Sequence, residues 1–302
     1  MADLTPLLTI SGAFGAAFAG QYLGHKLTRN RDTEKQNKES LQNLYSPLVY
    51  KIVDYIDIEC SNSIITPNNF IDELEIYVLD HLNIQLKENT NDLFNNILAD
   101  ISEKLTYADQ NLIMSFEIAK KYGKEFNYGQ EKATLVKNIY SVRSRIELSS
   151  VFLSQYLKLN KQLKTLSKAI QDELEEPYFY TLVVRILLQM RLFSIAINYS
   201  FRDKDLIVSA FGIDKYLLEK AENLVKRHEY ILNDLDDFSS KVSEELDVDS
   251  YAFLDELIHK MEYMDHYESD APSIWRRLIE EDRNKEEKQL EDFLENYVNK
   301  DS

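Results

Sequence analysis

Residues 178–201, YFYTLVVRILLQMRLFSIAINYSF, are the most apolar stretch of the chain beyond residue 24. A helix that is apolar on all sides is buried, either in a protein core or in a membrane. Arg185, Gln189 and Arg191 interrupt the stretch near its middle, and each arginine at the centre of a membrane span costs about 2.5 to 3.5 kcal/mol. The stretch therefore predicts the central buried helix of a globular body.

The two arginines of this stretch need partners if they are buried. A buried arginine is tolerated where a carboxylate pairs with it, and Glu173, Glu175 and Glu176 lie shortly before the stretch. Two interpretations remain open for Arg185 and Arg191: a structural ion pair, or a pocket that binds an anionic ligand.

Helical spacing of apolar residues continues on both sides of this stretch, as in Leu41, Leu44 and Leu48. No segment of comparable length alternates as a strand does, and only three glycines follow residue 24, too few for the tight turns of a β domain. The predicted fold class is all-α, a multi-helix bundle with long helices. We expect helices over 93–105, 112–122, 132–170, 215–246, 250–266 and 272–299, with Glu176-Pro177 beginning the apolar helix.

The run from Leu4 to Gly24 contains no charged residue. A membrane-spanning helix needs about 20 mostly apolar residues, so the run predicts an N-terminal transmembrane anchor over residues 1–27. Basic residues stay on the cytoplasmic side of a membrane, and here they follow the run: His25, Lys26, Arg29, Arg31, Lys35 and Lys38. We expect a single-pass protein of the cell membrane, with the N-terminus outside and the C-terminal domain cytoplasmic.

A secretory signal peptide is the alternative to an anchor, because Ala17-Phe18-Ala19 has the A-x-A form of a cleavage site. Signal peptides begin with a positively charged region, and no Lys or Arg precedes Leu7. The anchor is therefore favoured, and cleavage of the leader would instead give a secreted helical protein.

Small residues line one side of the predicted span, where Gly12, Ala16, Gly20 and Gly24 recur at every fourth position. An aromatic row that begins at Phe14 is offset by two residues, about 200° around a helix, and lies nearly opposite. Rows of small residues let membrane helices approach closely. The row predicts that copies of the protein associate through this face of the span. The lipid bilayer is the other expected partner of the chain.

Four parts of the chain are expected. The anchor over 1–27 is followed by a polar, basic juxtamembrane linker over 28–40 that has no apolar residue and carries an i,i+4 pair, Glu34 and Lys38. A helical cytosolic domain covers 41–268, with a break near 123–130, and a charged C-terminal helix covers 269–302.

The charge of the chain limits its partners. The formal net charge is −17, and the basic residues near the span leave the rest of the chain strongly acidic. Nucleic-acid binding depends on Lys and Arg that neutralise phosphates, so the acidic charge works against nucleic acid as the main partner. The single cysteine, Cys60, cannot form an internal disulfide and agrees with a reducing cytosol.

Motifs of the common enzyme classes are missing from the sequence. It contains no P-loop, dinucleotide fingerprint, nucleophile elbow or zinc-type cysteine pair. One polar set remains: Asp255, His259, Glu262 and His266 are spaced by four, three and four residues and share one helix face. This face is a weak candidate metal site of a metal-dependent helical enzyme. The apolar neighbours of the set favour a solvated face instead, and no cofactor is expected.

The interpretation that best fits these observations is a membrane-tethered, acidic, all-helical protein that works by binding. We expect an interaction, sensor or effector subunit of a bacterial system, with an unidentified protein partner, more than an enzyme. The layout resembles that of small anchored effectors in bacterial stress and phage-defence systems, and this likeness concerns architecture alone.

Overall fold

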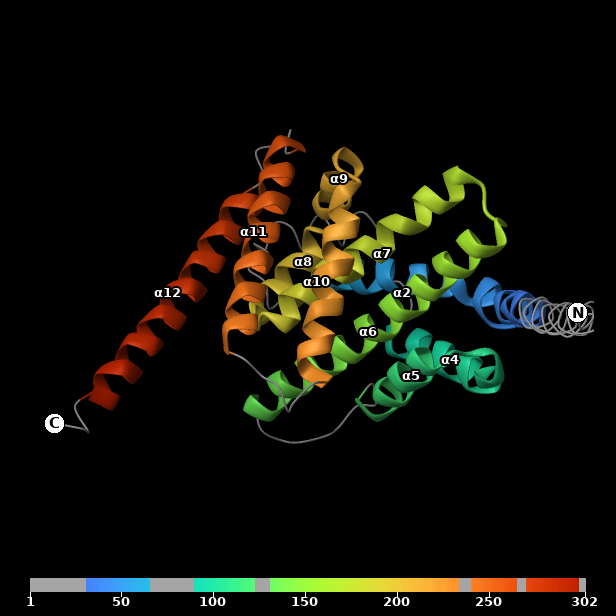
Figure 1. Ribbon diagram of the computed structural model, residues 1–302, viewed down its shortest axis with the longest axis horizontal. Helices are drawn as coiled ribbons and strands as arrows, with labels where there is room; N and C mark the ends of the chain where they lie inside the picture. Colours follow the sequence, from blue (N-terminus) through green and yellow to red (C-terminus); the bar gives the residue numbers. More distant parts are fainter. Residues whose placement is uncertain (1–30, 66–89, 123–130, 234–239, 265–269, 299–302) are drawn as a thin grey trace, which may run out of the picture.

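The computed structural model describes residues 31–65, 90–122, 131–233, 240–264 and 270–298 (Figure 1). Within these ranges the chain forms helices joined by turns, without strands, which confirms the predicted all-α, multi-helix bundle. None of the described helices is long and apolar enough to cross a membrane. The predicted anchor over 1–27, with its row of small residues from Gly12 to Gly24, lies outside the described residues.

The bundle consists of long α-helices with short π and 3₁₀ segments between some of them. Residues 31–40 are helical and mostly exposed, and within them Lys38 Nζ lies 2.8 Å from Glu34 Oε1, the predicted pair. The later elements are η1 (Leu41–Tyr45), α2 (Ser46–Ile65), α4 (Thr90–Glu103), η2 (Leu105–Tyr107), α5 (Gln110–Tyr122), α6 (Glu131–Leu163), α7 (Lys168–Gln189), η3 (Ile195–Tyr199), α8 (Ser200–Arg202), α9 (Lys204–Ile213), α10 (Tyr216–Asn233), α11 (Ser240–Met264) and α12 (Ala271–Val298).

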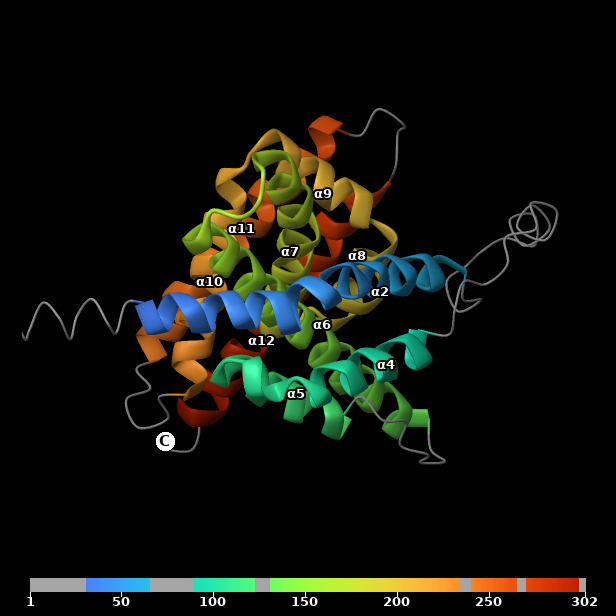
Figure 2. The same cartoon turned by 90° about the vertical axis from the view of Figure 1, so that its right-hand side faces the viewer.

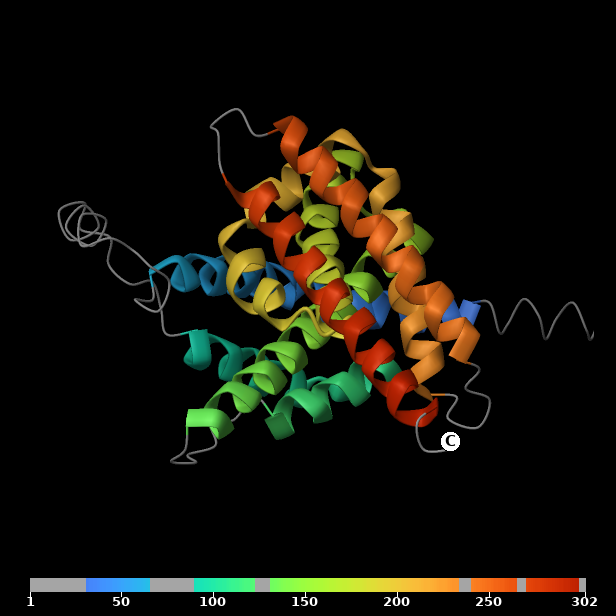
Figure 3. The ribbon, with the colours of Figure 1, turned by 90° about the vertical axis from the view of Figure 1, so that its left-hand side faces the viewer.

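Helix α7 lies at the centre of the bundle. Every residue from Pro177 to Leu188 is buried, and α6, α9, α10 and η3 pack around the helix. Figures 2 and 3, which view the molecule from opposite sides, both show α7 surrounded by other helices. The apolar stretch therefore forms the central buried helix that its sequence predicts, although this helix ends at Gln189 and the chain turns before η3.

The predicted start of the apolar helix at Glu176-Pro177 is wrong, because α7 begins at Lys168, after the N-cap Ser167, and Pro177 lies inside it. Proline lacks the N–H of an i→i−4 hydrogen bond and costs a helix interior about 3 kcal/mol. Full burial of one large apolar side chain contributes about 1.5 to 3 kcal/mol. The many buried side chains that follow Pro177 thus outweigh its local cost.

The single helix predicted over 132–170 is also wrong, because α6 ends at Leu163 and α7 begins a few residues later. Lys164 adopts a φ of 53°, and the N–H of Thr165 donates to the carbonyl of Asn160 at 3.2 Å. This left-handed residue and 6→1 hydrogen bond form a Schellman-type helix end. The chain reverses there, so that α6 and α7 pack side by side.

Helix α7 ends in the same way. Arg191 has a φ of 61°, its N–H donates to the carbonyl of Leu188 at 3.3 Å, and the N–H of Leu192 donates to the carbonyl of Leu187 at 2.9 Å. Glycine usually occupies this position because it has no Cβ. A chain with few glycines after its N-terminal run uses basic residues at both of these helix ends.

Helices α10 and α11 are joined by a partly buried polar contact. His228 Nε2 lies 3.0 Å from Ser250 Oγ, whose own proton is donated to the carbonyl of Leu246 at 2.7 Å. Ser250 therefore accepts from His228.

Helix α11 runs without interruption through residues 247–249, so the predicted boundary between helices over 215–246 and 250–266 is wrong.

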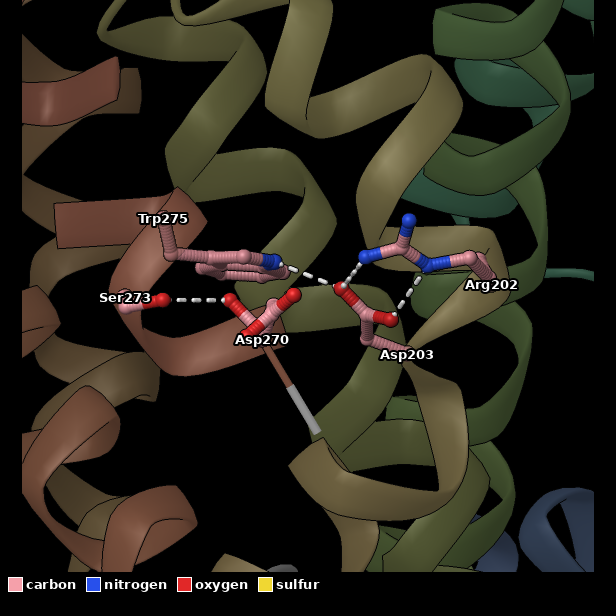
Figure 4. A network of polar contacts seen from close by, with 5 residues as sticks. All are labelled: Arg202, Asp203, Asp270, Ser273 and Trp275. Atoms are coloured by element: carbon pink, nitrogen blue, oxygen red, sulfur yellow. Dashed lines mark hydrogen bonds and ion pairs between the residues drawn. The ribbon is translucent and has the colours of Figure 1, made fainter. Parts of the chain in front are cut away.

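The C-terminal helix α12 is attached through a buried carboxylate between α8 and α9 (Figure 4). The indole Nε1 of the fully buried Trp275 donates to Asp203 Oδ2 at 2.8 Å. Arg202 donates to both oxygens of Asp203, from Nε at 2.8 Å and from Nη2 at 3.1 Å. Figure 4 also shows Ser273 Oγ, which donates to the Asp270 carbonyl at 2.8 Å in the first turn of α12. These contacts fix where α12 leaves the body.

Replacing Arg191 by glycine should stabilise the protein. A non-glycine residue in the left-handed region costs about 1 to 2 kcal/mol, whereas glycine loses about 0.5 to 1 kcal/mol more backbone entropy on folding. The net gain of somewhat under about 1 kcal/mol should raise the melting temperature by up to about 2 to 4 °C in calorimetry. Arg191→Ala removes the same charge but keeps Cβ and should give no gain. Equal increases in melting temperature for both variants would show that the gain in stability comes from removing the charge and not from relieving backbone strain.

Stability should fall in mild acid because of His228. Burial, with a further contribution from the positive charge of Arg227, lowers the pKa of His228 to about 4, whereas an unfolded histidine has a pKa of about 6.5. Between these values the unfolded chain binds a proton that the folded chain does not. The stability that neutral His228 contributes to the folded state is therefore complete above about pH 6.5, and it is lost as the pH falls toward about 4.

The measurement is the free energy of unfolding of the parent chain and of His228→Gln at about pH 7.5 and about pH 5. Glutamine keeps a donor for Ser250 but does not titrate. The parent chain should lose stability relative to the variant as the pH falls. Parallel pH profiles would contradict a buried, neutral His228.

Candidate functional site

A groove of about 1040 Å³ opens on the side of the bundle formed by α5, α6, α7 and α10. Helix α6 packs against both α5 and α7, and α10 packs against the other side of α7. The deepest side chains come from α6 and α7, while α5 and α10 form the two edges. The lining of the groove therefore extends along several helices.

Helix α7 contributes one continuous stripe to the groove. The α7 residues that line the groove are polar apart from Leu182 and Leu188, and the polar ones recur along one side of the helix: Gln171, Glu175, Tyr178, Arg185 and Gln189. Their span of 18 residues corresponds to about 27 Å of helix. A polar stripe on an otherwise buried helix is the sequence signal that identifies this site.

Two sets of hydrogen bonds cross the floor of the groove, each linking α6, α7 and α10. Tyr178 Oη donates to Glu222 Oε1 at 3.0 Å and lies 3.2 Å from Ser154 Oγ. Burial is the main cause that raises the pKa of Tyr178, so its hydroxyl stays protonated and can donate. These contacts hold the tyrosine across the floor.

The second set lies two turns further along α7. Arg185, which is 8% exposed, donates from Nη1 to Ser150 Oγ at 3.1 Å and pairs through Nη2 with Glu229. Both partners again come from α6 and α10. A structural ion pair is thus present at Arg185, and its guanidinium already has an anionic partner.

The partner of Arg185 is none of the three carboxylates that precede the apolar stretch in the sequence. Glu229 lies 44 residues after Arg185, on another helix, whereas Glu175 accepts from Gln171 at 2.7 Å. Arg191 is exposed at the end of α7 and does not line the groove. Of the two interpretations, the structure shows the ion pair at Arg185, and Arg191 lies outside the groove lining.

The exposed charged residues of the groove lining are mostly basic. Four lining lysines are exposed and form the rim of the groove: Lys158 and Lys161 on α6, Lys215 in the turn before α10, and Lys226 on α10. Arg143 is partly buried. The lining carboxylates other than the exposed Glu219 are partly buried: Asp109, Glu147, Glu175, Glu222 and Glu229. Of these, Glu175, Glu222 and Glu229 accept the hydrogen bonds described above. The accessible rim is therefore locally basic on a chain with a net charge of −17.

Apolar side chains on α5 complete one edge of the groove. Met114 is 56% exposed and Ile118 is 37% exposed, and both line the groove one helical turn apart. Val151 of α6, also a lining residue, is partly buried. This edge offers apolar contact next to the basic rim.

The candidate metal face on α11 is largely solvated. Asp255 and His259 are exposed, and Glu262 accepts from Arg276 Nη2 at 2.7 Å while lying 3.7 Å from His259 Nδ1. His266 lies outside the described residues. Among the residues that the structure describes, no group of three or more His, Cys, Asp or Glu side chains is arranged to hold a metal ion.

Two other reactive groups have structural roles. The Cys60 thiol is buried, its pKa is raised to about 12 by burial, and it donates to Tyr180 Oη at 3.3 Å. A thiol with such a pKa is not an active nucleophile. His228 donates to Ser250 and so does not act as its base.

Comparison with known proteins supplies no relative for this chain. No family model matches it, and no curated protein or solved structure shows a significant match. No residue role can be carried over from a relative, so the functional conclusions rest on the geometry and chemistry of the groove.

Proposed function

We propose that the protein is a membrane-tethered binding subunit whose cytoplasmic helical domain receives a partner in the groove between α5 and α10. The observation that carries this proposal is the groove itself, with its polar floor and its basic and apolar edges. Sensor or effector activity would follow from what the groove binds.

Binding is favoured over catalysis because the polar groups of the floor hold one another. Tyr178 and Arg185 are each bonded on two sides. Catalysis by a nucleophile or general base requires such a group to reach the substrate. Side chains that cross-link three helices instead provide a firm surface for recognition.

The dimensions favour a macromolecular partner. Small-molecule pockets typically have volumes of about 300 to 1,000 Å³, and the groove, at about 1040 Å³, lies just above that range. The α7 residues that line it span about 27 Å, the length of an 18-residue helix. Grooves of this form accept a helix from another protein.

Location at the membrane rests on the uncharged run from Leu4 to Gly24 and on the basic residues after it. The full chain should stay in the membrane fraction through high-salt and carbonate washes. A shortened chain that begins at Leu41 should be soluble. Release of the intact full chain by either wash would refute the anchor.

The groove is tested by site-specific photocrosslinking in native membranes. A photoreactive amino acid at Met114, on the groove edge, should give a discrete adduct that disappears when Lys158 and Lys161 are both replaced by Glu. As a control, the photoreactive amino acid is placed at Tyr263, which is 74% exposed on α11 and does not line the groove. Identical adducts from both positions would show that the groove is not the binding surface.

A further inference from the structure

The second half of α12 is an acidic amphipathic segment. Residues 284–298, NKEEKQLEDFLENYV, carry five carboxylates and two lysines. Their apolar positions Leu290, Phe293, Leu294 and Tyr297 follow the i, i+3, i+4, i+7 pattern of one helix face. As part of α12 the segment is helical, and its 15 residues span about 22 Å.

This segment extends away from the helices that hold α12. The first half of α12 buries Ala271, Trp275 and Ile279, and the Trp275–Asp203 hydrogen bond fixes its position. Helix α12 packs mainly on α11 and η3, whereas the groove is formed by other helices. Figure 1 shows the C-terminal end of α12 reaching past the rest of the bundle.

The groove and this segment are complementary in length, charge and polarity. The α7 residues that line the groove span about 27 Å of helix, and the segment spans about 22 Å. Exposed lysines on α6 and α10 form its rim, and Met114 and Ile118 form an apolar edge. A helix with an apolar face flanked by carboxylates suits both features.

We infer that the groove binds residues 284–298 of α12 from a second copy of this chain. The inference rests on the proposed function of the groove and names its occupant. A second copy is required because α12 is held on the α11 and η3 side of its own body. Two copies tethered to one membrane would meet at a raised effective concentration.

The first experiment measures binding of a fluorescent peptide of residues 284–298 to the full chain by anisotropy. Lys158→Glu combined with Lys161→Glu should weaken binding at least about tenfold, and added salt should weaken it further. The matched variant replaces Lys120 and Lys121 by Glu; both are exposed on α5 outside the groove lining. This variant changes the net charge equally and should bind as the parent chain does.

A control peptide with Ser at positions 290, 293 and 294 keeps every charge but loses the apolar face, and should not bind. Absence of binding by the native peptide, or equal binding to both double-lysine variants, would overturn the inference. A Met114 photoadduct with a different protein would then still support the proposed function, so the two failures can be told apart.

The second experiment places cysteines in the full chain, where the single native cysteine, Cys60, is buried. Met114→Cys combined with Leu294→Cys should form disulfide-linked dimers under mild oxidation in membranes. Tyr263→Cys combined with Leu294→Cys should not. Dimers formed equally by both pairs would reflect association elsewhere, such as through the predicted span, and would overturn the assignment of α12 to the groove.

Discussion

A helix covered on every side keeps its polar side chains only where neighbouring elements supply partners, because an unpaired buried polar group costs about 1 to 3 kcal/mol. Helix α7 meets this constraint at Tyr178 and at Arg185, each of which contacts a serine of α6 and a glutamate of α10. The two sets join the same helices two turns apart. Satisfying these two side chains therefore fixes α6 and α10 on either side of α7, and the groove between the outer helices follows from that arrangement.

The same constraint determines which part of the groove is available for recognition. Tyr178 and Arg185 are already bonded to the protein, so the floor provides shape and rigidity more than new hydrogen bonds. The rim differs, because lysines such as Lys158 and Lys226 are exposed there. A partner would therefore be selected by the rim charges and by apolar contact with Met114 and Ile118, at little cost in rearranging the floor.

The helical class and the central helix were predictable from the sequence because both depend on local composition and periodicity. Helix ends were less predictable. Pro177 is a helix breaker by local rules, yet buried side chains after it outweigh that cost, and the true break uses Lys164, a residue with no turn signature. The Arg185 partner was missed for a related reason: Glu229 is distant in sequence, and only tertiary packing brings it near.

Charge sets a further requirement on any self-association. Two copies with a net charge of −17 repel each other at long range, but salt screens this repulsion beyond about 8 to 10 Å at physiological ionic strength. Attraction between copies must therefore act over short distances, where acidic and basic groups directly face each other. The exposed lysines around the groove, among them Lys161 and Lys215, provide basic groups at one place on an otherwise acidic protein. A rim of this kind favours one defined contact over general aggregation, because elsewhere on the acidic surface like charges predominate.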